Sequence, residues 1–418
     1  MTRLMKDSGV KWIGEIPINW QVKKVKHNFF RKKGKPNSEN FDILTLARSG
    51  IKIRDISTGE GQIAADYSNY NPVAPGDILI NPMDLVSGDN SNISEVCGVI
   101  SPAYVNLQAN KDTNPYFYNY YFKLQYWLGS FFTHGKGVSY ENRWTLNDET
   151  IKNFPIVYPS KEEQEKIVQF LNEKLNRISK LIKDTQQSIE ELKKYKETLI
   201  TEVVTKGLDK NGEMKDSGIE WMGYIPVKWS VLKFGNVINI KSNLVNPNDF
   251  PNFQQVSPDD IEKDTAKLIK FKTVKESGVS SSNYYFYKGQ ILYSKIRPKL
   301  NKVVIAPFDG LCSADMYPID TTENSEFIIY LMMSYYFKHQ VSMITADRVK
   351  MPKINREELS NLIIVLPNRF EQNQIVSYLN DKLSGINIII NDKEKVIQEL
   401  EQYKKSLIYE YVTGKKEV

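Results

Sequence analysis

Two long segments that share one hydrophobic pattern constrain this chain more than any other feature of its sequence. Residues 161–205 return as residues 369–413 at a constant offset of 208. In both, leucine and isoleucine recur at steps of three, four or seven, which is typical of a long helix with a narrow coiled-coil seam. At a rise of roughly 1.5 Å per residue, each segment predicts a helix of about 65 Å. The seam, which we expect to be the helix and partner interface, comprises Ile167, Leu171, Leu175, Ile178, Ile182, Leu192, Leu199, Ile375, Leu379, Leu383, Ile386, Ile390, Leu400 and Leu407.

Both segments also carry signals for where a helix starts and stops. Ser160 with Glu163, and Asn368 with Glu371, have the spacing of a capping box. A glycine follows shortly after each segment, which favours a left-handed residue at the helix end. The helices are therefore predicted to begin and end with the repeated segments.

A second repeat shows that the whole chain is one unit used twice. Residues 5–20 return as residues 214–229, at an offset of 209. Only eight residues, 206–213, separate the first long segment from this second copy. Because an extended chain spans at most about 3.4 Å per residue, the second copy must follow at the far end of the first helix. We therefore expect the two helices to be antiparallel.

The predicted fold class is α+β, with two mixed α/β globular domains separated by two long antiparallel coiled-coil helices and related by a pseudo-two-fold internal repeat. The expected boundaries are 1–160 for the first domain, 161–206 for the first helix, 207–368 for a linker plus the second domain, and 369–418 for the second helix and tail. Within the domains we expect strands at 41–46, 77–80, 96–107, 154–158, 290–293, 303–306 and 362–366, and helices at 115–132 and 325–343.

Tryptophans and cysteines give further expectations. Each copy carries two tryptophans around a Gly-x-Ile-Pro turn, which we expect to anchor the domain to a helix end. Cys97 and Cys312 lie in different halves without metal-ligand spacing, so we expect two buried thiols and neither a zinc site nor a disulfide framework. No apolar run is as long as a membrane span, and the expected location is the cytoplasm.

The net charge of +6 is distributed unevenly. The first long segment has nine basic and nine acidic residues, and the second has six and seven, so the other 328 residues carry +7. Basic residues cluster within 23–35 and again within 295–302. Such clusters on globular parts indicate a bound polyanion, although a solvated surface would account equally well for any one of them.

Motifs for catalysis are missing. There is no GxGxxG and no Walker loop, and residues 135–139 lack the required spacing. Residues 114–117 resemble the Asn-Pro-Pro-Tyr motif of adenine methyltransferases only loosely. His27, His134 and His339 have no triad-like partners in sequence order, although a triad is assembled in space. The pattern favours binding over catalysis by this chain.

A family resemblance rests on two repeated motifs. Met-Lys-Asp-Ser-Gly-x-x-Trp-x-Gly-x-Ile-Pro-x-x-Trp occurs at 5–20 and 214–229, and Pro-x-x-x-Glu-Gln-x-x-Ile at 159–167 and 367–375. With the two-unit layout, these resemble the specificity subunit of type I restriction-modification systems across the whole chain. The resemblance implies a non-catalytic subunit whose two target recognition domains each read one half of a bipartite site in double-stranded DNA. It also implies spacer helices that dock two methyltransferase subunits, and nuclease-translocase subunits that join for cleavage. S-adenosylmethionine, ATP and Mg²⁺ would belong to those partners, with no cofactor on this chain.

Polar, basic loops on a rigid scaffold are where base-reading side chains usually lie. The candidate DNA-binding residues are Lys136, Ser139, Tyr140, Asn142 and Arg143 in the first domain and Lys295, Arg297, Lys299, Arg348, Lys350 and Lys353 in the second. Two other classes stay open. A coiled-coil scaffold or regulator would lack salt-dependent DNA affinity. A stand-alone methyltransferase or nuclease would turn over substrate without partners.

Overall fold

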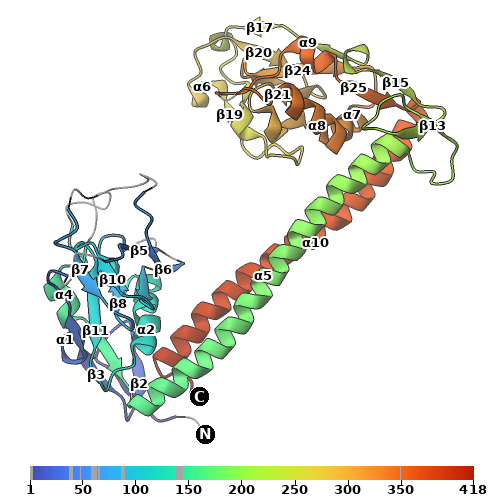
Figure 1. The fold of residues 1–418 in the computed structure, drawn as a ribbon. Coiled ribbons are helices and arrows are strands. Elements are labelled where there is room, and N and C mark those ends of the chain that lie inside the picture. The colour runs from blue at the N-terminus through green and yellow to red at the C-terminus, as the bar shows by residue number, and fades with distance from the viewer. Residues whose placement is uncertain are drawn as a thin grey trace. The chain divides into compact units, whose positions relative to one another are not determined.

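The computed structural model describes residues 3–36, 41–47, 49–57, 64, 66–85, 90–137, 145–348 and 350–418. The chain divides into two compact units, Met1–Thr185 with Lys395–Val418 and Gln186–Glu394 (Figure 1). Each unit contains one globular domain and a part of both long helices. The two units are described separately below.

The long helices are α5 (Lys161–Lys206) and α10 (Arg369–Val412). Both start at the predicted residues. The Ser160 hydroxyl accepts a hydrogen bond from the Glu163 amide (3.2 Å), and the Asn368 side chain accepts one from the Glu371 amide (3.0 Å). These bonds satisfy amide groups that have no partner within the first turn of a helix. The predicted helix starts are therefore confirmed.

The helices pair antiparallel within each unit. In the first unit, the ring of Phe170 near the start of α5 lies 4.5 Å from that of Tyr411 near the end of α10. In the second unit, Lys196 Nζ near the end of α5 donates to Asn387 Oδ1 of α10 at 2.6 Å. The start of one helix thus meets the later part of the other, as the short linker predicted.

The first unit is built on a four-stranded antiparallel sheet with helices packed against it. Its strand order is β4-β11-β8-β9, and α2 contributes four fully buried aromatic side chains, Phe117, Tyr118, Tyr121 and Phe122, to the core. The elements are β1 (Met5–Asp7), β2 (Glu15–Pro17), β3 (Gln21–Lys24), α1 (Val25–Asn28), β4 (Phe29–Arg31), β5 (Leu44–Ala47), β6 (Gly50–Ile53), β7 (Asn71–Val73), β8 (Ile78–Ile80), β9 (Ser91–Ile93), β10 (Gly98–Ile100), β11 (Val105–Ala109), α2 (Pro115–Trp127), α3 (Ser130–His134), α4 (Asp148–Asn153) and β12 (Pro155–Tyr158).

The second unit repeats this scaffold. Its four-stranded sheet, β16-β24-β21-β22, corresponds to the first. Its five-stranded sheet, β17-β20-β23-β18-β19, contains the same pairings as the β7–β10 and β5–β6 pairs of the first unit, which the parallel bridge between Ile43 and Val99 joins. The elements are β13 (Met214–Asp216), β14 (Tyr224–Pro226), β15 (Ser230–Lys233), η1 (Phe234–Asn236), β16 (Ile238–Ile240), β17 (Leu244–Val245), η2 (Pro247–Asp249), β18 (Gln254–Val256), η3 (Pro258–Asp260), β19 (Lys272–Thr273), α6 (Val274–Ser277), β20 (Asn283–Phe286), β21 (Ile291–Ser294), η4 (Pro298–Leu300), β22 (Val303–Ile305), β23 (Gly310–Cys312), β24 (Met316–Thr321), α7 (Ser325–Met333), α8 (Tyr335–Ile344), α9 (Arg356–Ser360) and β25 (Ile363–Leu366).

The parts of the two domains nearest the long helices correspond element by element. The hairpin β1–β2 has its counterpart in β13–β14, and the antiparallel pair β3–β12 in β15–β25. In each domain the second strand of that pair leads directly into a long helix. The predicted α+β fold with an internal repeat is confirmed.

A glutamine at the start of each long helix fastens the domain to it. Gln164 is fully buried, accepts a hydrogen bond from the Asn114 amide (2.8 Å) and donates one to the Pro159 carbonyl (3.0 Å). Gln372 makes the equivalent bonds to Asn324 and Pro367, both at 3.0 Å. The glutamine of the repeated Pro-x-x-x-Glu-Gln motif therefore links each domain to the first turn of a long helix.

Two half-buried tyrosines add a second attachment. Tyr120 of α2 donates its hydroxyl to Asn172 of α5, and Tyr330 of α7 donates to Asn380 of α10. Burial raises the pKa of both phenols to about 12, so they remain donors at any physiological pH. The same contact is thus made twice, once in each unit.

Only one of the two tryptophans in each copy lies at the end of a long helix, although the sequence predicted this for both. Trp20 Nε1 donates to Glu163 at the start of α5 (2.8 Å), and Trp229 is buried beside the glycine that ends α5. Trp12 instead donates to Gln125 of α2 (3.0 Å), and the ring of Trp221 lies against Tyr336 of α8. The prediction was wrong for Trp12 and Trp221 because these indoles pack on helices of their own domains.

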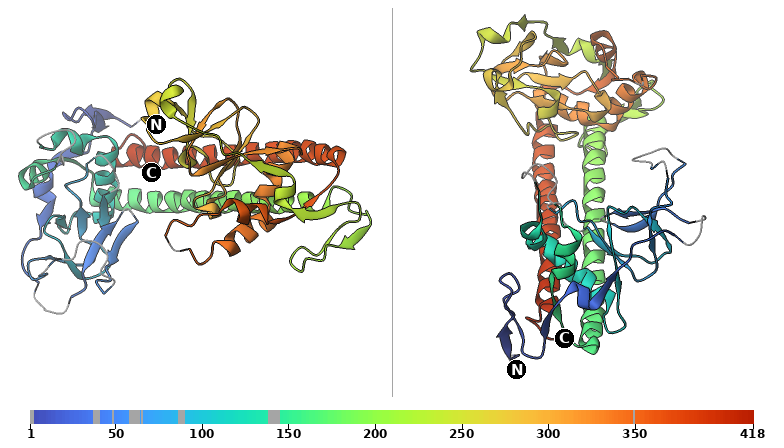
Figure 2. Two further views of the ribbon diagram at one scale, coloured as in Figure 1. Left: turned by 90° about the horizontal axis from the view of Figure 1, so that it is seen from above. Right: turned by 90° about the vertical axis from the view of Figure 1, so that its left-hand side faces the viewer.

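The glycines that end the long helices differ in how closely they are packed. Gly207 and Gly414 have φ angles of 74° and 73°, which non-glycine residues rarely adopt. A Cβ on Gly414 would lie 2.4 Å from Pro17 of β2, whereas the nearest atoms to one on Gly207 are 3.3 Å away. The hairpin β1–β2 therefore packs directly against the C-terminal end of α10, as Figure 2 also shows.

We expect Gly414→Ala to be more destabilising than Gly207→Ala. Both changes strain the backbone at a cost of about 1–3 kcal/mol. Gly414→Ala should add about 1–3 kcal/mol of overpacking against Pro17. Urea unfolding of the two variants, followed by tryptophan fluorescence, measures the difference. Equal loss of unfolding free energy would contradict the close contact at Gly414.

Three details of the domains differ from the sequence-based expectations. The helix predicted at 115–132 is two helices, because Gly129 adopts a left-handed conformation between α2 and α3. The helix predicted at 325–343 is broken at Ser334, which is extended and caps α8. Cys312 is buried as predicted, but Cys97 is exposed, since it lies in the turn between β9 and β10.

Candidate nucleic-acid interface

Two basic loops of the second domain lie next to each other and are joined by backbone hydrogen bonds. The loop 295–301 follows β21, and the loop 345–353 follows α8. Ile296 and Lys353 form an antiparallel bridge, and the Arg297 amide donates to the Pro352 carbonyl at 2.8 Å. The structure therefore joins the two candidate segments into one surface, which we call the basic edge (residues 295–299 and 350–353).

Most cations of the basic edge project into solvent. Arg297, Lys299, Lys350 and Lys353 are exposed, and only Lys353 makes an ion pair with a described residue, Asp315 at 3.2 Å. Lys295 is half-buried, with its ammonium 5.5 Å from the centre of the Tyr317 ring. An exposed cluster of cations with few acidic neighbours attracts a polyanion.

Arg348 holds the second loop in place. Its guanidinium binds both carboxylate oxygens of Glu358 in α9 and also donates to the Lys353 carbonyl. The paired hydrogen bond raises the pKa of Arg348 and lowers the pKa of Glu358, so both stay charged. Among the candidate residues, Arg348 therefore supports the loop that carries Lys350 and Lys353.

The first domain presents one described candidate. Lys136 is exposed, and its backbone exchanges two hydrogen bonds with Thr145 (2.8 and 3.0 Å). Ser139, Tyr140, Asn142 and Arg143 lie outside the described residues. The structure thus leaves the first candidate loop as a prediction from sequence.

Several cations of the basic run at 23–35 bind partners within the first domain. Lys32 pairs with the buried Asp77 at 2.8 Å, and both Arg31 and Lys33 pair with Asp148 of α4. The Lys23 ammonium lies over the Tyr158 ring. Because these groups have internal partners, the run contributes less free positive charge than its sequence indicates.

The fourteen seam residues lie inside the units. Twelve are buried, and Leu192 and Leu400 are partly buried. Six of them belong to the hydrophobic core of the first unit and Leu400 packs against it; the six are Ile167, Leu171, Leu175, Ile178, Ile182 and Leu407. Their role in binding a partner stays a prediction.

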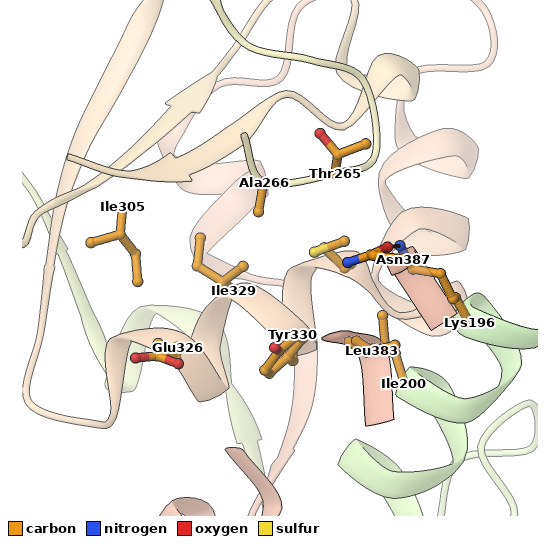
Figure 3. Close-up of a pocket in the computed structure, with 11 residues that line it drawn as sticks. Lys196, Ile200, Thr265, Ala266, Ile305, Glu326, Ile329, Tyr330, Leu383 and Asn387 are labelled. Atoms are coloured by element: carbon orange, nitrogen blue, oxygen red, sulfur yellow. Dashed lines mark hydrogen bonds between the residues drawn. The ribbon is translucent and has the colours of Figure 1, made fainter. Parts of the chain in front are cut away.

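A cavity of about 250 Å³ in the second unit lies between the long helices, α7 and the loop around Thr265 (Figure 3). Lys196 and Asn387 lie together at one side of it and Glu326 at the opposite side, and apolar side chains that include Ile200 and Ile329 also line it. Lys196 donates to Asn387, and Glu326 accepts from Asn380. Burial lowers the pKa of the Lys196 ammonium. The lining residues include no nucleophile next to a base.

Among the described residues, no three His, Cys, Asp or Glu side chains are grouped so that they could hold a metal ion. None of the helices in the same ranges has both the length and the apolar character needed to cross a membrane.

Comparisons with known proteins converge on one family. A family model described as the type I restriction modification DNA specificity domain matches residues 18–191 and 226–402. The chain is 34% identical over 241 residues to the type I restriction enzyme EcoDI specificity subunit of Escherichia coli, and this similarity spans about half of that relative, 54% of each chain. It is 27% identical over 371 residues to the MjaVIII specificity subunit of Methanocaldococcus jannaschii, covering 83% of this chain and 82% of that one.

A solved structure has the same fold. One of its chains, from work on complex assembly and conformational transition of the type I R-M system, superposes with a TM-score of 0.70 at 14% identity, over 95% of this chain and 98% of that chain. This likeness concerns the fold alone, but it extends over nearly the whole length of both chains.

Proposed function

This chain belongs to the type I restriction-modification DNA specificity family, and we propose that each of its two domains reads one half of a bipartite, gapped site in double-stranded DNA. The two segments that match the family model fall one in each half of the chain. The function is thus DNA sequence specificity, which the chain supplies to a larger complex rather than catalysing a reaction itself.

The observation that carries this proposal is the contrast between a repeated scaffold and different outer faces. The attachment of each domain to the long helices is the same down to single hydrogen bonds, through Gln164 and Gln372. Away from the helices the side chains differ, since the loop after β21 carries Lys295, Arg297 and Lys299, whereas the segment 81–90 after the corresponding strand β8 contains Asp84 and no basic residue. The two domains are attached to the long helices in the same way but present different outer side chains. This arrangement suits the recognition of two different half-sites at a fixed spacing.

The basic edge is the proposed DNA contact of the second domain. Arginine and lysine are suited to guanine in the major groove and to phosphates, and Arg297, Lys299, Lys350 and Lys353 are exposed there. Lys136, with Ser139, Tyr140, Asn142 and Arg143, is the proposed contact segment of the first domain. The long helices would set the length of the gap.

The proposed partners are two methyltransferase subunits and, for cleavage, nuclease-translocase subunits, in the cytoplasm. In the second unit an open groove runs along α5 beside Tyr335 and Tyr336, and Trp221 packs on Tyr336 at its side. Exposed tyrosine and tryptophan are frequent anchors of protein interfaces. S-adenosylmethionine, ATP and Mg²⁺ are assigned to the partners, and no reaction step is assigned to residues of this chain.

Mapping of methylated adenines tests the proposal. Cells that carry the gene together with its partner genes should show methylation in a gapped motif of two specific parts, and cells without this gene should lack that motif. A scaffold without DNA specificity would leave the methylation pattern unchanged on deletion. Turnover of DNA by the purified chain alone would instead indicate a catalytic protein.

A further inference from the structure

An apolar side chain stands among the cations of the basic edge. Met351 is 54% exposed, and both its neighbour Lys350 and the nearby Lys353 are exposed. A single exposed apolar side chain is common on a protein surface, so exposure alone does not distinguish Met351. What distinguishes it is its place among the exposed cations of the basic edge.

The backbone conformation of Met351 is also unusual. Its φ is +47°, although it is not glycine and it precedes Pro352, a position at which extended conformations are favoured. Such residues persist only where the surroundings enforce them, and they concentrate at functional sites. The facing residue Arg297 has a φ of +46°, so the strained positions lie side by side where the two loops meet.

Several contacts fix the residues that follow Met351. The Arg297 amide bonds to Pro352, Ile296 bridges Lys353, and Arg348 ties the Lys353 carbonyl to Glu358. Glu358 in turn accepts from the Asn355 amide at 2.9 Å as part of a capping box of α9. The side chain of Met351 is thus presented to solvent from a rigid frame.

We propose that Met351 reads the methyl group of a thymine in the second half-site. This inference rests on the proposed function and adds a specificity-determining residue to it. Cations can bind guanine and phosphate, but the feature that marks thymine in the major groove includes its C5 methyl, which an apolar atom recognises. Met351 supplies that atom among exposed cations, and contact with the methyl would bury surface that is exposed in the free chain.

Thymine-to-uracil substitution tests the contact directly, because it removes only the methyl group. After the motif has been mapped, the assembled complex is titrated with DNA in which each thymine of the second half-site is replaced in turn. Wild type should lose roughly fourfold in affinity at one position, the effect of burying one methyl group. Met351→Gly, which fits a positive φ, should bind thymine and uracil DNA equally at that position.

Met343 provides a matched control. It is the same residue type in the same domain, is 65% exposed, and lies in α8 without a positive φ. Met343→Ala should keep the full discrimination between thymine and uracil.

Three results would overturn the inference while leaving the proposed function intact. The wild-type complex could be insensitive to uracil throughout the second half-site, Met351→Gly could retain the discrimination, or Met351→Gly could weaken assembly with partner subunits instead. A complex that binds all DNA sequences alike would overturn the proposed function and this inference together.

Discussion

Replacing Arg297, Lys299, Lys350 and Lys353 together by glutamine is expected to abolish recognition of one half-site and leave the other unchanged. These are the exposed cations that the structure brings to one edge of the second domain. A single base-contacting arginine or lysine is worth about 1–3 kcal/mol, so the combined loss should exceed roughly 100-fold in affinity. Each lost phosphate contact should also lower the slope of log affinity against log salt by about 0.9.

Four other lysines of the same domain give the matched control. Lys270, Lys272, Lys275 and Lys288 are also exposed and lie in or next to β19, α6 and β20, outside the basic edge. Their replacement removes the same charge and should change neither half-site. Binding of defined duplexes by the assembled complex, measured at several salt concentrations, distinguishes the two variants. Equal losses from both would mean that net charge, and not the basic edge, governs binding.

The long helices could be predicted from sequence because their pattern is local. Each has a regular apolar stripe, a capping residue at its start and a glycine at its end, and these signals act within a few residues of one another. Ser160 and Asn368 make the predicted capping bonds. The antiparallel arrangement could also be predicted, since it follows from helix length and linker length alone.

The breaks in the domain helices could not be predicted from their continuous apolar pattern. Residues 325–343 read as one helix, but Ser334 breaks it, because its side chain caps α8 by accepting from the Phe337 amide. A serine within a helical pattern can either continue or cap a helix. The tertiary packing of α7 and α8 decides between these outcomes, and that packing has no local signal.

The basic residues of the candidate site could be predicted from the sequence, but the pairing of the loops that carry them could not. Sequence identified Lys295, Arg297, Lys350 and Lys353, yet the pairing of their loops depends on a bridge between residues that are 57 positions apart, Ile296 and Lys353. Met351 could not be predicted from the basic pattern, because its side chain carries no charge. Its signal in sequence is weak: one apolar residue next to proline within a basic loop.

Insertion of seven residues into both long helices is expected to lengthen the gap of the recognised motif by about three base pairs. Seven residues preserve the 3.5-residue repeat of the seam and extend a helix by roughly 10 Å, while DNA rises about 3.4 Å per base pair. The insertion points are the positions at which the two units divide, after Thr185 in α5 and after Glu394 in α10. Neither domain is altered, so both half-sites should keep their sequence.

An insertion of two residues at the same points is a control, because it disrupts the packing of the long helices without adding a whole heptad. Two residues turn a helix by roughly 200°, which moves the seam side chains of one part to the solvent face, so we expect loss of stable complexes and of methylation. Sequencing of methylated adenines from a DNA library with variable gaps measures both variants. A seven-residue variant that assembles but still selects the original gap would show that the partner subunits, and not α5 and α10, set the spacing.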